Sequence, residues 1–225
     1  MLAKRIITTL MLNNGVLFRS KKFEADYRYT LNFVDMWSVD EVVLLDITRN
    51  LKFDSSLKNI FFSEMKKISK NSYIPLTVGG GVRELKHIEK LLKNGADKII
   101  INSKAIENIN FVKLAAKEFG SQCIVISIDV KQKNKSFLLM ENYGKKISKF
   151  NTLEYLKDVQ DNGAGEIFLQ SIDRDGSLLG YDMEILEYIK NEIKIPLIVS
   201  SGAGNWSHVK LSLIHISEPT RRTPI

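Results

Sequence analysis

Ile74-Pro-Leu-Thr-Val-Gly-Gly-Gly81 and Ile195-Pro-Leu-Ile-Val-Ser-Ser-Gly202 are two similar segments that lie 121 residues apart in the chain. A second pair of similar segments, Asp40-Glu-Val-Val-Leu-Leu-Asp46 and Gly165-Glu-Ile-Phe-Leu-Gln-Ser171, lies 125 residues apart. Each segment holds a short apolar run, which is typical of a buried strand. The repeat indicates a chain built from two similar halves.

Short β-branched runs alternate with amphipathic helical patterns along the sequence. We predict strands at residues 5–9, 41–47, 74–78, 98–102, 122–129, 166–171 and 195–200, and helices at residues 29–37, 57–69, 84–94, 105–119, 153–162 and 183–192. This alternation indicates a parallel sheet, either open and doubly wound or closed into a barrel. Four βα units in each half favour the closed form. We therefore expect an α/β fold, a TIM (βα)8 barrel of two half-barrel repeats, with functional sites at the C-terminal ends of the strands.

The second half departs from the repeat at its end. In the first half, the glycine-rich strand and its helix are followed by Asn94-Gly-Ala-Asp-Lys-Ile-Ile-Ile-Asn102, but no such turn and strand occur near residue 216. Residues 211–225 are instead similar to a translated sequencing-library adapter. We therefore expect a single, incomplete βα-barrel domain over residues 1–210, truncated before the eighth βα unit, and a non-native tail over residues 211–225.

The composition excludes several classes of protein. The 225 residues are 44% hydrophobic and 26% charged with a single cysteine, Cys123, which excludes a fibrous, disordered or disulfide-stapled chain. No apolar run approaches the ~20 residues that span a bilayer, so we expect a cytoplasmic protein with no membrane partner. The net charge is +7, and most of the basic residues are scattered over predicted helix faces, where they interleave with Glu. The densest basic cluster, residues 131–135, lies in a predicted short loop and lacks interleaved aromatics. We expect no nucleic-acid partner, and an anionic small-molecule substrate explains the excess charge equally well.

Glycine-rich turns follow predicted strands at repeat-related positions. Gly80 and Gly81 end one strand, and Asn102 and Ser103 end the next, which would present backbone N–H groups to an anion. In the other half, the corresponding residues are Asp175, Gly176 and Gly202. Glycine also serves packing at such positions, but the pairing of two such sites predicts a substrate with a phosphate at each end.

Acidic residues stand at the ends of predicted strands, where a barrel would direct them to its functional face. Asp129 follows an apolar run and is a candidate general acid or base. Asp46 can equally be a loop hydrogen-bond acceptor, and Asp173 can be part of a local ion pair. The histidines are scattered, so we expect no metal and no cofactor.

Charged residues stand at the opposite ends of four strands, where they would form a ring at the floor of the barrel. Without further information, a salt-bridge layer that stabilises the fold is the default interpretation. The four residues are Arg5, Glu41, Lys98 and Glu166.

Taken together, several motifs resemble the cyclase subunit family (HisF) of imidazole glycerol phosphate synthase. The resemblance covers residues 1 to about 210 and rests on Met1-Leu-Ala-Lys-Arg-Ile-Ile7, Leu45-Asp-Ile-Thr48, Thr77-Val-Gly-Gly-Gly81, Gly95-Ala-Asp-Lys98, Gly120-Ser-Gln122, Gly163-Ala-Gly-Glu166 and Ser171-Ile-Asp-Arg-Asp-Gly176. It implies a βα barrel that binds a glutaminase subunit on its floor as a heterodimer. It also implies that ammonia passes along the barrel axis to a ribulosyl-formimino aminoimidazole carboxamide ribonucleotide with two phosphates.

The resemblance also implies roles for individual residues. The floor residues Arg5, Glu41, Lys98 and Glu166 match the family's gate to the ammonia channel, and Asp97 matches a residue at the glutaminase interface. Asp129 matches one of two catalytic aspartates. Gly81, Asn102 and Ser103 match one phosphate site, and Asp175, Gly176 and Gly202 match part of the other.

The first strand departs from the family. Met11 replaces the second catalytic aspartate, and Arg19 stands where the family has a substrate-contacting lysine. A thioether cannot transfer a proton, and losing a general acid costs roughly 10²–10⁴ in rate. The chain in this respect is similar to paralogues associated with amidation of surface-polysaccharide sugars, which we rank first. An imidazole glycerol phosphate cyclase of histidine biosynthesis is the second hypothesis, and a non-catalytic scaffold that activates a glutaminase is the third.

Overall fold

Seven parallel strands form the core of the computed structural model, which describes residues 5–26, 39–49, 53, 55–71, 73–134 and 136–215. Their spatial order is β11-β10-β7-β6-β5-β4-β1. The strands are β1 (Ile7–Asn13), β4 (Glu41–Asp46), β5 (Leu76–Gly79), β6 (Lys98–Ile101), β7 (Ile124–Lys133), β10 (Glu166–Ser171) and β11 (Leu197–Ser200). Seven of the predicted strands are therefore confirmed, in the neighbour order of a βα barrel.

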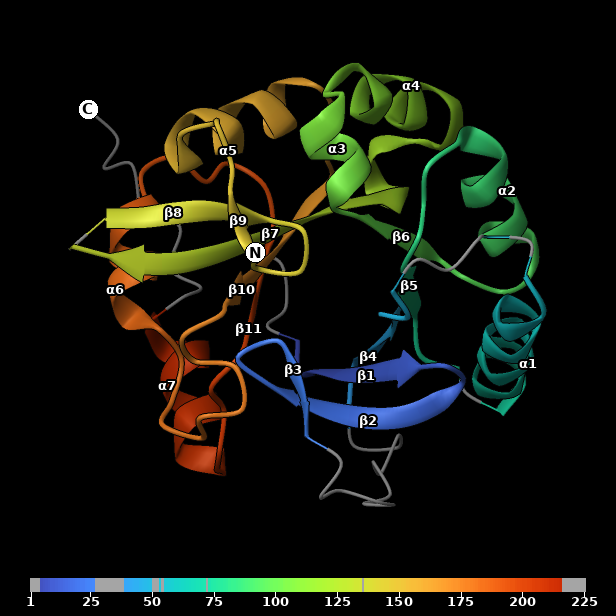
Figure 1. The fold of residues 1–225 in the computed structure, drawn as a ribbon, viewed down its shortest axis with the longest axis horizontal. Coiled ribbons are helices and arrows are strands. Elements are labelled where there is room, and N and C mark those ends of the chain that lie inside the picture. Colours follow the sequence, from blue (N-terminus) through green and yellow to red (C-terminus); the bar gives the residue numbers. More distant parts are fainter. Residues whose placement is uncertain are drawn as a thin grey trace, which may run out of the picture.

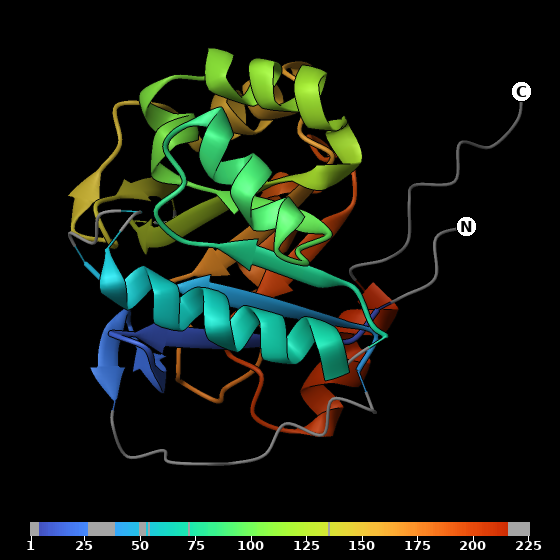
Figure 2. The same cartoon turned by 90° about the vertical axis from the view of Figure 1, so that its right-hand side faces the viewer.

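Helices cover the outer face of this curved sheet, as Figures 1 and 2 show. They are α1 (Ser56–Asn71), α2 (Leu85–Lys93), α3 (Ser103–Glu107), α4 (Asn110–Phe119), α5 (Thr152–Asp161), α6 (Met183–Ile189) and α7 (Trp206–His215), with a short 3₁₀ turn at Ser121–Cys123. Within the described ranges, no strand pairs with both β11 and β1. The architecture is that of a TIM barrel, whose sheet runs from β11 round to β1.

One predicted helix is divided in two. The pattern over residues 105–119 predicts a single helix, but α3 ends at Glu107 and α4 begins at Asn110. The Asn108 side chain accepts a hydrogen bond from the Asn110 N–H at 3.1 Å, which competes with the helical backbone and starts a new helix. The helix predicted at residues 29–37 lies outside the described residues.

Two hairpins extend from the barrel at places where no strand was predicted. β1 continues into β2 (Val16–Lys21) and β3 (Glu24–Asp26), and β7 continues into β8 (Ser136–Glu141) and β9 (Lys146–Ile147). The basic segment predicted as a loop at residues 131–135 instead begins with the last three residues of β7. In the first hairpin, Asn14 and Gly15 have φ angles of 51° and 78°, the backbone that a two-residue hairpin turn requires.

The apolar core has two parts. A large cluster packs between the sheet and the helices, and a smaller inner cluster fills the barrel interior. The buried members of the inner cluster are Val43, Leu45, Ile100, Val125, Phe168 and Ile198. Since strand side chains alternate between the two faces, charged or polar residues two positions from these also face the interior.

The inner side chains form three tiers from the N-terminal ends of the strands, which we call the floor, to their C-terminal ends, which we call the mouth. Two strands show this order from floor to mouth. Along β6 and the residue after it, the three tiers contain Lys98, Ile100 and Asn102, and along β10 they contain Glu166, Phe168 and Gln170. Residues four positions apart in a strand are separated by about 13 Å. The fold thus places a charged tier, an apolar tier and a polar tier in succession along the barrel interior.

Two further observations concern the chain as a whole. In the part of the chain that the structure describes, none of the helices is long and apolar enough to cross a membrane. Helix α7 continues through residue 215, across the position where we expect the barrel domain to end.

Candidate active site in the barrel mouth

Asp129 lies near the mouth on β7, and only 8% of its surface is exposed. Its carboxylate accepts hydrogen bonds from Asn102 Nδ2 at 2.9 Å, Gln170 Nε2 at 3.0 Å and Ser127 Oγ at 3.2 Å. Burial raises the pKa of Asp129, although the three donors oppose that shift. A carboxyl group with a raised pKa is more easily protonated near neutrality, which suits a general acid or base.

Met11 lies on β1 and packs against the inner apolar cluster. Ser20 on β2 donates its hydroxyl hydrogen to Met11 Sδ at 3.8 Å, a weak contact for a thioether acceptor. The side chain therefore supplies packing at the mouth but no ionisable group.

The predicted phosphate residues of the first half lie in two different settings. Gly80 has a φ of 113°, and a Cβ there would meet Asp46 O at 2.1 Å, whereas a Cβ at Gly81 would meet nothing within 4 Å. The close packing explains glycine at position 80, and open space surrounds position 81. The Asn102 side chain contacts Asp129, and Ser103 is exposed at the start of α3.

Two residues of the second predicted phosphate site, Asp175 and Gly176, lie against the β2–β3 hairpin. The Phe23 N–H donates to Asp175 Oδ2 at 3.0 Å, and the Lys22 N–H donates to Asp175 O at 3.2 Å. A Cβ at Gly176 would meet Ser20 O at 2.6 Å, and one at Gly202 would meet Gly180 O at 2.2 Å. Both glycines therefore permit close backbone approaches beside this part of the mouth.

The other two acidic residues at strand ends do not share the setting of Asp129. Asp46 accepts the Thr48 N–H at 3.1 Å and contacts Lys58 Nζ at 3.0 Å, so its carboxylate faces helix α1. Asp173 accepts the backbone N–H of Gln132 at 2.7 Å. Both carboxylates accept hydrogen bonds from backbone N–H groups of a loop or strand. For Asp46, this agrees with the alternative prediction of a loop hydrogen-bond acceptor.

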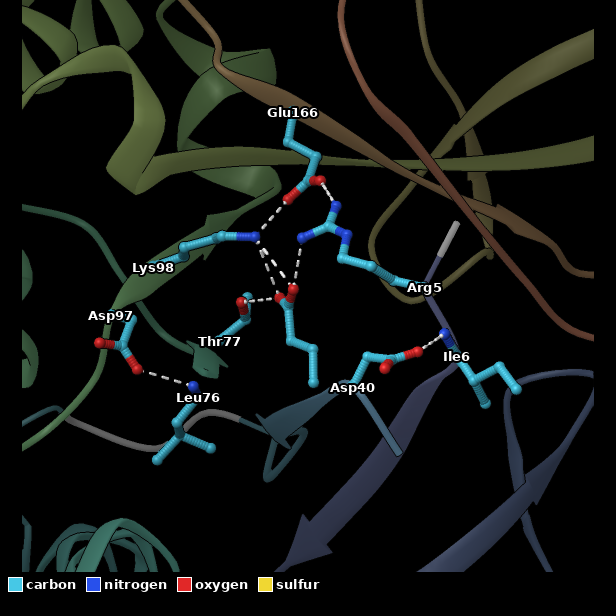
Figure 3. A network of polar contacts seen from close by, with 9 residues as sticks. Arg5, Ile6, Asp40, Leu76, Thr77, Asp97, Lys98 and Glu166 are labelled. Atoms are coloured by element: carbon cyan, nitrogen blue, oxygen red, sulfur yellow. Dashed lines mark hydrogen bonds and ion pairs between the residues drawn. The ribbon is translucent and has the colours of Figure 1, made fainter. Parts of the chain in front are cut away.

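The four charged residues predicted at the floor come together in one network, the floor cluster, which Figure 3 shows. Lys98 Nζ lies 3.0 Å from Glu41 Oε2 and 2.9 Å from Glu166 Oε2. Arg5 Nη1 lies 2.6 Å from Glu41 Oε2, and Arg5 Nη2 bonds to Glu166 Oε1. Thr77 Oγ1 also donates to Glu41 Oε1 at 2.5 Å.

Exposure differs within the floor cluster. Glu41 is completely buried, whereas the Arg5 side chain is 35% exposed. Arg5 is therefore the most exposed of the four side chains, ahead of Lys98 at 18%. Two aspartates near this end, Asp97 and Asp40, are exposed, and each accepts one backbone N–H, from Leu76 and Ile6 respectively.

Arg19 lies on β2 opposite Asp26 of β3, and its side chain is outside the described part of the structure. Among the described residues, no group of three or more His, Cys, Asp or Glu side chains could hold a metal ion.

Sequence reasoning missed three residues that surround the predicted ones. Gln170 and Ser127 donate to Asp129, and Lys58 joins Asp46 to Gly80. Gln170 left a signal, since it is a polar residue two positions after the inward-facing Phe168 and therefore also faces the interior. Lys58 left none, because one lysine in an amphipathic helix resembles any solvated one.

Comparisons with known proteins agree with this architecture. A family model described as histidine biosynthesis protein matches residues 8–216. Subunit HisF of imidazole glycerol phosphate synthase from Sulfolobus acidocaldarius is 40% identical over 216 residues, which cover 91% of this chain and 82% of the relative. Its counterpart from Sulfurisphaera tokodaii is 38% identical over 213 residues, covering 92% and 84%.

A Campylobacter jejuni protein, provisionally named imidazole glycerol phosphate synthase subunit hisF2, is 40% identical over 208 residues. These cover 90% of this chain and 81% of the relative. The seven-stranded βα architecture, the family match and identities extending over nine-tenths of the sequence lead to one conclusion: the chain belongs to the HisF family of histidine biosynthesis proteins.

Proposed function

We propose that this chain is the ammonia-accepting subunit of a glutamine-dependent synthase, which forms a heterodimer with a glutaminase in the cytoplasm. The observation that carries the proposal is the floor cluster. Two buried carboxylates, Glu41 and Glu166, are each bound by both Arg5 and Lys98. Such an arrangement, with one cation partly exposed, supports a point of entry that a docked partner can open by moving Arg5.

The barrel interior supports the passage of ammonia rather than ammonium. Between the floor cluster and Asp129 lie apolar side chains, among them Ile100, Val125 and Phe168. A charged ammonium ion loses its hydration in such surroundings at high cost, whereas neutral ammonia is a small polar molecule with a much smaller penalty. Ammonia released at the floor would therefore reach the mouth in its nucleophilic form.

The exposed aspartates near the floor supply a surface for the glutaminase. Asp97 is fixed by its bond to the Leu76 N–H, and Asp40 by its bond to the Ile6 N–H. Carboxylates that are held in place lose little side-chain entropy when a partner binds. We propose that they pair with basic residues of the glutaminase around Arg5.

At the mouth, Asp129 serves as the general acid or base and the glycine turns hold the phosphates of the substrate. The raised pKa of Asp129 allows its carboxyl group to carry a proton for a leaving oxygen or nitrogen. Gly81 supports the first phosphate, and Gly176 and Gly202 support the second.

For the acceptor, we infer a phosphorylated sugar whose acetamido group becomes an acetamidino group: ammonia enters, and the carbonyl oxygen leaves as water. Met11 carries this inference, because the first strand lacks the second acid that imidazole ring formation uses in the resembled family. One ionisable group, Asp129, suffices to shuttle a proton in the amidation.

The intact hydrogen-bond shell of Asp129 favours a second candidate, imidazole glycerol phosphate formation. In that reaction, ammonia attacks the ribulosyl-formimino ribonucleotide and yields imidazole glycerol phosphate and aminoimidazole carboxamide ribotide. The relatives with HisF names are described as subunits of that synthase.

Isotope transfer tests these proposals. The full chain is mixed with a glutaminase partner, glutamine labelled with ¹⁵N in its amide, and either the ribonucleotide or an acetamido sugar. Mass spectrometry then measures the label in each product, for the wild type, Arg5→Ala, Asp129→Asn and the control Lys190→Ala, which removes only an exposed ion pair on α6.

With the wild type and the control, we expect labelled product from the acetamido sugar and none from the ribonucleotide. Asp129→Asn is expected to retain glutamate release but lose labelled product. If Asp129→Asn incorporates label as well as the wild type does, the catalytic role proposed for Asp129 fails. Glutamate release without labelled product from the wild type would indicate a scaffold that only activates the glutaminase.

A further inference from the structure

Lys58 is a buried cation that belongs to neither the floor cluster nor the Asp129 site. It lies in the first turns of α1, and 1% of its surface is exposed. Lysine is almost never buried without partners, because the ammonium ion loses its hydration. That burial lowers the pKa of Lys58, and the contact with Asp46 opposes the shift.

The surroundings of Lys58 fix its ammonium group at one place. Nζ lies 3.0 Å from Asp46 Oδ2 and donates to Gly80 O at 3.0 Å. The Phe61 ring centroid is 4.1 Å from Nζ, and that of Phe53 is 5.2 Å away. The group is thus held by one carboxylate, one carbonyl and two aromatic rings.

The bond to Gly80 O has a consequence for the next residue. The carbonyl of Gly80 and the N–H of Gly81 belong to the same peptide group, which is trans. In a trans peptide, these two bonds point in opposite directions. With the oxygen held by Lys58, the Gly81 N–H must point away from α1.

The space around this peptide is asymmetric. A small cavity of about 20 Å³, roughly the size of one water molecule, is lined by Asp46, Thr48, Phe53, Lys58, Gly80 and Gly81. A Cβ at Gly81 would touch nothing, whereas one at Gly80 would collide with Asp46. Two glycines in a row have four flexible backbone dihedrals, and Lys58 is the side chain that restrains their shared peptide.

We propose that Lys58 is a positioning residue for phosphate, which holds the Gly80–Gly81 peptide so that the Gly81 amide donates to a substrate phosphate. This inference rests on the proposed function, in which Gly81 supports that phosphate. The ammonium charge also polarises the peptide whose N–H acts as the donor. The alternative is that Lys58 only fastens α1 to β4 through Asp46.

The test compares the affinity of variants of the full chain for inorganic phosphate, measured by calorimetry. Asp46→Asn/Lys58→Met removes the charge of Lys58 without leaving a buried carboxylate unpaired. Lys90→Met is the matched control: Lys90 also lies over the Phe53 ring, at 5.6 Å, but is exposed on α2. Circular dichroism confirms that each variant folds.

We expect the double variant to bind phosphate about tenfold more weakly than the wild type, the loss of one hydrogen bond to a charged group, and Lys90→Met to bind normally. For the phosphorylated substrate, KM should rise while kcat changes little. A folded double variant with wild-type phosphate affinity would overturn the inference while leaving the proposed phosphate site intact. If the wild type itself binds no phosphate, both fail.

A measurement on the wild type covers the case in which the double variant does not fold. In a ¹⁵N-labelled chain, phosphate should shift the Gly81 amide resonance downfield, as expected for a new charge-assisted hydrogen bond. Phosphate binding that leaves the Gly81 resonance unmoved would contradict the proposal.

Discussion

The ionised form of Asp129 is stabilised by three hydrogen-bond donors and destabilised by burial. The effect of burial is the larger one, so the pKa of Asp129 is raised. A folded-state pKa above the unfolded value of about 4 means that ionisation weakens the fold. The penalty is absent below about pH 4 and complete once the pH exceeds the folded pKa. We therefore expect the unfolding midpoint of Asp129→Asn, relative to the wild type, to rise between pH 4 and pH 8 in calorimetric scans. A difference independent of pH would contradict this.

Met11 allows a reciprocal prediction. Met11→Asp places a carboxylate beside the Ser20 hydroxyl, which already points at Sδ and can donate to the new group. If the missing acid is what prevents imidazole ring formation, this change should raise that activity by ~10²-fold or more. Met11→Leu, which keeps the volume, should change nothing. Equal imidazole glycerol phosphate production by all three chains would show that position 11 does not select the reaction.

How far the residues could be predicted depends on how local their signal is. Asp129 was predictable as a residue near the mouth, since it follows an apolar run along one strand, although Asp46 in a similar position turns its carboxylate toward α1 instead. Its partner Asn102 follows β6 and its partner Gln170 lies on β10, 27 and 41 residues away in the chain. Lys58 was not predictable either, because its burial depends on the aromatic rings around it.

At the scale of elements, the β2–β3 hairpin is attached to the opposite side of the mouth through Asp175. Asp175→Ala removes the acceptor of the Phe23 N–H while the backbone bond from Lys22 remains. The loss of one hydrogen bond worth about 1 kcal/mol should speed tryptic cleavage after the exposed Lys21 and Lys22 about fivefold. The Asp173 carboxylate accepts the Gln132 N–H in the β7–β8 hairpin instead, so Asp173→Ala should leave this rate unchanged.

The parallel strands were predictable because a short run that is apolar on both faces is typical of a strand in a sheet covered on both sides. The hairpins were not recognised, although Asn14-Gly15 is a strong turn signal between two extended segments. The polar residues Arg19, Ser20 and Lys21 make the second half of β2 resemble a loop, so the turn signal was not interpreted as a hairpin. The break between α3 and α4 was missed because the apolar spacing continues across Asn108.

At the scale of the molecule, the floor cluster is a buried ion-pair network that contributes to stability, and its role as the entry point for ammonia is our proposal. Lys98→Met leaves Glu41, which is fully buried, with Arg5 as its remaining charged partner in the cluster. We expect a loss of about 2 kcal/mol in the free energy of unfolding, measured with urea. Lys93→Met breaks only an exposed pair on α2 and should cost less than about 0.5 kcal/mol. Equal losses in the two variants would contradict a buried network.

The extent of the barrel domain, residues 1–210, and the non-native character of residues 211–225 stay predictions. Seven parallel strands already place the floor cluster and Asp129 at opposite ends of one interior. The account of function rests on this arrangement.

The most direct test of this account measures glutamate and imidazole glycerol phosphate together, in a mixture of the full chain, a glutaminase partner, glutamine and the ribulosyl-formimino ribonucleotide. We predict that the chain stimulates glutamate release while no imidazole product accumulates. The floor cluster would still bind and activate the glutaminase, but Met11 leaves the mouth without the second acid for imidazole ring formation. Imidazole glycerol phosphate formed in step with glutamate would contradict the sugar-amidation claim. A glutaminase that the chain does not stimulate would contradict the ammonia-accepting role itself.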